Sequence, residues 1–93
     1  MVGFCGYKCH PDGVGEICGL YVDPEIQGRG AGYRLLRDAE LIIARSGAKR
    51  SIVEASLAAL PFYTRAGYSV TEQMTHLTRG GLEIEVRRLE RPL

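Results

Sequence analysis

The sequence predicts a mixed α/β domain with a central mixed sheet and the element order β-β-α-β-α-β-β. Two observations carry this prediction. Short strand-like runs rich in aromatic and branched residues are separated by turn residues. One longer segment instead carries its apolar residues at helical spacing, between two of those runs. A strand–helix–strand order implies a crossover connection and a parallel strand pair, whereas adjacent strands joined by a tight turn are antiparallel.

The first two strands are predicted over residues 2–10 and 14–22. Pro11-Asp12-Gly13 lies between them and is a strong turn signal, so the two strands should form an antiparallel hairpin. Pro24 ends the second strand because proline has no N–H to donate to a sheet.

A helix follows Gly32. Its apolar residues form one stripe, which comprises Leu35, Leu36, Ala39, Ile42 and Ile43. Gly47 is a plausible end of the helix, and residues 51–55 then read as the third strand.

Ser56 can cap a second helix that runs to about Arg65 and stops at Gly67, with an irregular first turn at Pro61. Residues 68–78 and 82–89 read as two further strands. In the last of them, apolar residues at 82, 84 and 86 alternate with charged ones, which predicts one wet face.

Length and composition exclude several classes of protein. Ninety-three residues allow a single domain, 1–93. The 12 basic and 11 acidic side chains leave a net charge of +1, which argues against nucleic acid or a membrane surface as partner. Apolar runs are too short to span a bilayer.

Three cysteines, an odd number, favour free thiols in a reducing cytoplasm. Cys5, Cys9 and His10 lie close together, but Cys18 and His76 complete no zinc-ligand spacing, so we expect no metal site.

The most informative stretch is the glycine-rich turn at residues 27–32, between a strand and a helix. Backbone N–H groups and the helix dipole bind anions at such a place, and glycines allow close approach of a phosphate. Tyr33 and Arg34 stand where a P-loop needs lysine and a hydroxyl residue, and the spacing is not that of a dinucleotide fingerprint. The two interpretations from local sequence are a phosphate cradle and a tight turn without a ligand.

Two motifs extend this interpretation. The pattern Gln27-x-x-Gly30-x-Gly32, preceded by Leu20-Tyr21-Val22-Asp23-Pro24-Glu25, resembles the acetyl-CoA signature of the GNAT superfamily of N-acetyltransferases. The later stretch Ala59-Leu60-Pro61-Phe62-Tyr63-Thr64-Arg65-Ala66-Gly67-Tyr68 resembles the second motif of the same family. The two motifs occur in the order expected for the family, and the resemblance covers nearly the whole chain, residues 2–89.

The resemblance implies acetyl-CoA as co-substrate and transfer of its acetyl group to an amine by direct attack. The pantetheine arm would lie beside the strand residues Leu20, Tyr21 and Val22, with the Val22 N–H facing the thioester carbonyl. The pyrophosphate would be held at the turn. The residues implied there are Gln27, Gly28, Arg29, Gly30, Ala31, Gly32 and Tyr33.

Two residues match the family's catalytic positions. Tyr63 would protonate the leaving thiolate, for which a phenol is suited because it is protonated at neutral pH. Its alternative interpretation is a core aromatic beside Phe62. Glu16, eleven residues before Gln27, would act as general base; its alternative is a solvated charge at a strand end. His10 and His76 show no partner in the sequence, and cysteine chemistry at Cys18 lacks a recognisable framework.

Compared with the family pattern, the first strand, two helices and second strand are missing before Met1. We therefore expect residues 2–10 to form an open sheet edge that promotes a homodimer, by edge pairing or element exchange. Two functions stay open: a minimal acetyltransferase acting on an unidentified amine, and a non-catalytic CoA-binding or structural remnant that self-associates.

Overall fold

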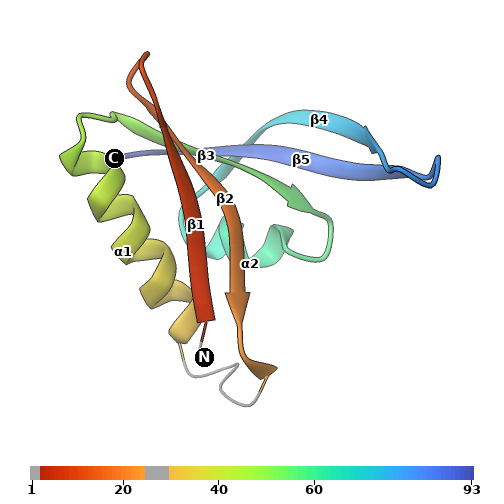
Figure 1. Cartoon of the computed structure of the whole chain (residues 1–93), viewed down its shortest axis with the longest axis horizontal. Coiled ribbons are helices and arrows are strands. Elements are labelled where there is room, and N and C mark those ends of the chain that lie inside the picture. Colours follow the sequence, from red (N-terminus) through yellow and green to blue (C-terminus); the bar gives the residue numbers. More distant parts are fainter. Residues whose placement is uncertain (1–2, 25–29) are drawn as a thin grey trace. The chain divides into compact units, whose positions relative to one another are not determined.

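The computed structural model describes residues 3–24 and 30–93, which form five strands and two helices. The strands make one mixed sheet in the order β1-β2-β3-β5-β4, which confirms the predicted fold class. The chain divides into two compact units, residues 1–51 with 92–93, and residues 52–91. Figure 1 shows the course of the chain through its elements.

The first unit contains a hairpin and a helix. Strands β1 (Gly3–His10) and β2 (Val14–Val22) pair antiparallel around a turn in which Gly13 has a positive φ of 82°. Both strands have the predicted bounds, except that Val2 lies outside the described residues. Helix α1 (Ala31–Arg45) packs against this hairpin, as Figure 1 shows beside β1 and β2.

Helix α1 buries part of the predicted stripe and one residue outside it. Leu36, Ala39 and Ile43 are buried, but Ile42 is 45% exposed, so its predicted core position is wrong. The buried place is taken by Glu40, whose carboxylate accepts a hydrogen bond from Arg37 Nη1 at 2.7 Å. Pairing with a guanidinium lets a carboxylate replace an apolar side chain at a helix face.

The second unit contains β4 (Ser69–Leu77) and β5 (Glu83–Pro92), which pair antiparallel, and α2 (Leu60–Arg65). Strand β3 (Arg50–Ser56) begins at the end of the first unit and continues into the second. Helix α2 begins at Leu60, later than predicted, because the Ser56 hydroxyl accepts from the Ala59 N–H and caps a turn before the helix. Gly67, with a φ of 97°, follows the helix end as predicted.

The face of β5 that was predicted to be apolar and buried is buried only in part. Val86 is buried, but Leu82 is 69% and Ile84 45% exposed. The physical reason is length: six helical residues span about 9 Å, whereas ten strand residues span about 33 Å. In Figure 1 the β4–β5 hairpin accordingly extends well beyond α2.

Candidate functional site

The sequence-predicted site residues fall in both units. Glu16, residues 20–22 and residues 30–33 belong to the first unit, and Tyr63 belongs to the second. Gln27, Gly28 and Arg29 lie outside the described residues.

The start of α1 has the backbone geometry of an anion-binding site. Gly30 is the N-cap residue and adopts the left-handed conformation, with φ 78° and ψ 6°. The first bond of the helix runs from the Arg34 N–H to the Gly30 carbonyl at 3.1 Å, so the N–H groups of Ala31 and Gly32 have no partner within the helix. The first turn of α1 holds no acidic side chain. N–H groups without an acceptor in the helix, together with the positive end of the helix dipole, therefore suit a phosphate group.

A β-bulge bends β2 just before the predicted pantetheine-binding residues. Gly6 pairs with Gly19 and Tyr7 with Ile17, so Cys18 is an extra residue on β2. Bulges turn a strand and re-aim the residues that follow it, and they are common beside active sites. Sequence reasoning missed this feature, although Gly19 next to the motif was a signal for it.

Beyond the bulge, Leu20 and Val22 are half-buried and Tyr21 is 45% exposed. The Tyr21 ring stacks on the ring of Phe4, with centroids 5.8 Å apart. Tyr21 pairs with Phe4 across the two strands, so the stack also holds their register. The stack with Phe4 therefore holds the C-terminal end of β2 against β1.

Glu16 is not a bare strand-end charge. It is the third residue of β2, lies opposite Lys8 on β1, and its Oε1 lies 2.8 Å from His10 Nε2. The side chains of His10 and Glu16 are 40% and 31% exposed. His10 therefore has a partner that the sequence did not reveal, because a diagonal pair across a hairpin requires knowledge of the register. His76 likewise pairs with Glu54, at 3.0 Å.

Tyr63 is buried within the second unit, at 6% exposure. Its ring makes edge contacts with Phe62 and Tyr68, with centroids 5.1 and 5.6 Å away. Two aromatic neighbours fix the orientation of the ring, which is what a precisely placed proton donor requires. The same contacts also satisfy the alternative interpretation of a core aromatic.

The three cysteines are free thiols. Burial and the nearby Glu16 carboxylate raise the pKa of Cys18, and Lys8 lowers it to a smaller extent. A raised pKa disfavours the nucleophilic thiolate, which does not favour cysteine chemistry at Cys18. Among residues 3–24 and 30–93, no three His, Cys, Asp or Glu side chains gather as a metal site. Neither described helix combines the length and apolar character of a bilayer span.

Comparison with known proteins defines the class. The sequence profile of the Acetyltransferase (GNAT) family matches residues 1–68. A glucosamine 6-phosphate N-acetyltransferase from Trypanosoma brucei brucei is 34% identical over 64 residues, which is 69% of this chain. A solved GCN5-related N-acetyltransferase from Rhodopseudomonas palustris covers 99% of the chain with 26% identity and a TM-score of 0.83. The chain shares the fold of this solved structure and belongs to the GNAT acetyltransferase family.

The chain is shorter than these proteins. It spans 44% of the trypanosomal enzyme and 54% of the Rhodopseudomonas chain. An IAA acetyltransferase from Bacillus cereus, at 20% identity and a TM-score of 0.81, shares the fold, and this chain covers 70% of it.

Proposed function

We propose that this protein is an acetyl-CoA-dependent N-acetyltransferase that moves an acetyl group to a primary amine. The observation that carries the proposal is the start of α1, where Gly30 in the left-handed conformation leaves the N–H groups of Ala31 and Gly32 at the helix terminus. This arrangement suits a pyrophosphate, and it lies inside the region that the family profile matches. Gln27, Gly28 and Arg29 complete the proposed cradle by resemblance to the family motif.

The proposed reaction is direct attack of the amine nitrogen on the thioester carbonyl. A C–N bond forms and the C–S bond breaks, so the amine must lose a proton and the thiolate must gain one. Glu16 accepts the amine proton, and the Tyr63 hydroxyl donates to the sulfur. The backbone of Leu20, Tyr21 and Val22 orients the pantetheine arm, and the Val22 N–H faces the carbonyl oxygen, where negative charge develops.

Acetyl-CoA binding at the start of α1 is tested by placing a negative charge at one end of the helix or the other. Ala31→Glu puts a carboxylate where the pyrophosphate would bind, while favouring the helix dipole. Ala44→Glu adds the same charge about 20 Å away along the helix, beyond the screening length of about 10 Å. We expect calorimetric titration to show acetyl-CoA binding that Ala31→Glu weakens and Ala44→Glu does not. Equal binding by both variants would contradict the cradle at α1.

Proton donation by Tyr63 is tested by removing a single oxygen atom. Tyr63→Phe removes the hydroxyl and keeps the ring contacts, so the fold should remain and acetyl transfer should fall. The measurement is the mass of acetylated amine formed from a panel of primary amines. Unchanged transfer by Tyr63→Phe would remove the proposed acid.

A second candidate function, self-association with or without CoA binding, is favoured by β1. This strand lies at one end of the sheet, and Phe4 and Tyr7 on it are 51% and 42% exposed. An edge strand with exposed aromatics and one charged residue, Lys8, is open to pairing with a second copy. We expect light scattering at micromolar concentration to give the mass of two chains, and Phe4→Lys to shift it toward one. A mass of one chain for the unaltered protein would contradict this candidate.

A further inference from the structure

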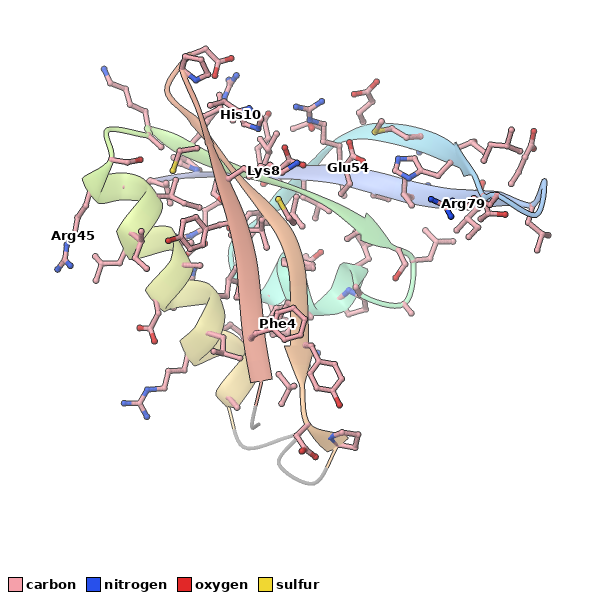
Figure 2. The ribbon with its side chains drawn as sticks, in the orientation of Figure 1. Phe4, Lys8, His10, Arg45, Glu54 and Arg79 are labelled. Carbon is pink, nitrogen blue, oxygen red and sulfur yellow. The ribbon has the colours of Figure 1, made fainter. Side chains whose placement is uncertain are left out.

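The hairpin of the first unit carries a paired histidine and glutamate that the family motifs do not include as a pair. His10 is the last residue of β1, and its Nε2 lies 2.8 Å from Oε1 of Glu16. In the register of the hairpin, Lys8 is opposite Glu16 and His10 is opposite Val14. His10 and Glu16 are thus diagonal neighbours, and diagonal neighbours on one face of a sheet lie within reach of long side chains. Figure 2 shows His10 near the end of β1 at the turn, and Lys8 farther from the turn on the same strand.

The chemistry of the pair shows which ring nitrogen of His10 carries the shared hydrogen. A carboxylate only accepts hydrogen bonds, so Nε2 of His10 carries the hydrogen in both the neutral and the charged ring. The bond occupies Oε1 of Glu16 and leaves Oε2 as the acceptor for an incoming proton. It also restrains a side chain that has three rotatable bonds and is otherwise half-exposed.

We infer that His10 is a positioning residue for Glu16, which it holds through the Nε2–H bond so that the second carboxylate oxygen accepts the amine proton. This inference rests on the proposed function, in which Glu16 is the general base. It adds a residue that no motif in the sequence marks.

Two other groups on the hairpin lie near Glu16. Lys8 lies opposite it on β1, and Cys18 lies two residues farther along β2, where its thiol donates to the Glu16 carbonyl at 3.8 Å.

Further charged residues lie near the turn of the hairpin. Asp12 is in the turn, and the backbone N–H of Lys49 donates to the Gly13 carbonyl at 2.8 Å. Near the end of α1, the uncharged Ser46 hydroxyl contacts Cys9, the strand neighbour of His10. Figure 2 shows Arg45 directed away from the hairpin.

The test uses two pairs of matched variants. His10→Leu removes the donor, whereas His10→Gln keeps an N–H group in place of Nε2–H. His76→Leu and His76→Gln are the controls, because His76 makes the same kind of pair with Glu54 in the second unit. We expect kcat/KM to fall about tenfold in His10→Leu, the size of one hydrogen bond to a charged group. His10→Gln should restore most of the rate, and both His76 variants should match the unaltered protein.

A second measurement needs no turnover. Nitrogen-15 NMR of the two histidine rings reports which ring nitrogen carries the proton, and the His76 variants assign the signals. Glu16→Ala removes the acceptor, so it should shift His10 from the Nε2–H tautomer toward a mixture and leave His76 unchanged. A His10 tautomer that is the same in Glu16→Ala, or equal rates in His10→Leu and His10→Gln, would overturn the inference alone. No acetyl transfer by the unaltered chain would overturn the proposed function, and with it the catalytic role of His10.

Discussion

Gly15 of β2 and Ile43 of α1 lie so close that a Cβ atom on Gly15 would overlap Cγ2 of Ile43. Both residues are buried, and Ile43 is fully buried. The glycine is therefore a packing residue that lets α1 approach the hairpin. This contact joins the helix whose start carries the proposed cradle to the strand that carries Glu16.

Substituting alanine at this contact should destabilise the protein. Gly15→Ala forces the helix and the strand apart, at a cost of about 1–3 kcal/mol, as for other overpacked cores. Gly19→Ala on the same strand is the control, because a Cβ at Gly19 meets nothing within 4 Å. Urea unfolding should show a lowered midpoint for Gly15→Ala and little change for Gly19→Ala. Equal midpoints would contradict the close approach.

Glycine should be required at position 30 because of its backbone conformation, and not because a side chain there would collide with a neighbour. A Cβ at Gly30 meets nothing within 4 Å, but its φ is 78°. Gly30→Ala should therefore cost about 1–2 kcal/mol, the price of the left-handed conformation for an ordinary residue. Gly30→Asn should cost less, since asparagine tolerates this conformation and caps helices. Thermal unfolding should rank glycine first, asparagine second and alanine last; a stable Gly30→Ala would contradict the assigned geometry.

Two leucines on or beside β5 should respond differently to substitution. Leu89 is fully buried, and Leu89→Ala should cost about 2–5 kcal/mol because it leaves a cavity. Leu82 is 69% exposed at the far end of the hairpin, and Leu82→Glu should change stability by no more than about 0.5 kcal/mol. Chemical denaturation measures both values. A large loss in Leu82→Glu would mean that the distal hairpin is covered in solution.

The stability of the protein should depend on pH through Cys5. Burial, followed by the Glu40 and Cys18 charges, raises the pKa of Cys5 from 9.0 to about 11. A raised pKa means that the folded state holds the proton more tightly, so the contribution is complete below pH 9 and is lost as the pH rises toward 11.

Cys5→Ala should therefore show a smaller loss of stability than the unaltered protein between pH 9 and pH 11. Urea unfolding across this range measures the slopes. The same slope in Cys5→Ala and the unaltered protein would show that Cys5 does not titrate as described.

Local chemistry was sufficient to predict most elements. Pro11-Asp12-Gly13 predicted the turn between β1 and β2, because Gly13 can adopt the positive φ that the turn uses. The helical spacing predicted α1, and Gly67 marked the end of α2. These features depend on residues within one or two turns of chain, and so they can be read without knowing the fold. The glycine-rich turn and the Phe-Tyr motif likewise placed the candidate site at the start of α1 and at Tyr63.

The sequence by itself thus determined the order of elements, the family and the residues that carry its motifs. Tertiary structure alone decided which residues became partners. Burial of Glu40 in place of Ile42, the bulge at Cys18 and the bond between His10 and Glu16 all depend on which strand or helix lies opposite at each position. The physical reason is that side-chain pairing across strands follows register and packing distance, which are set by contacts between segments far apart in the chain.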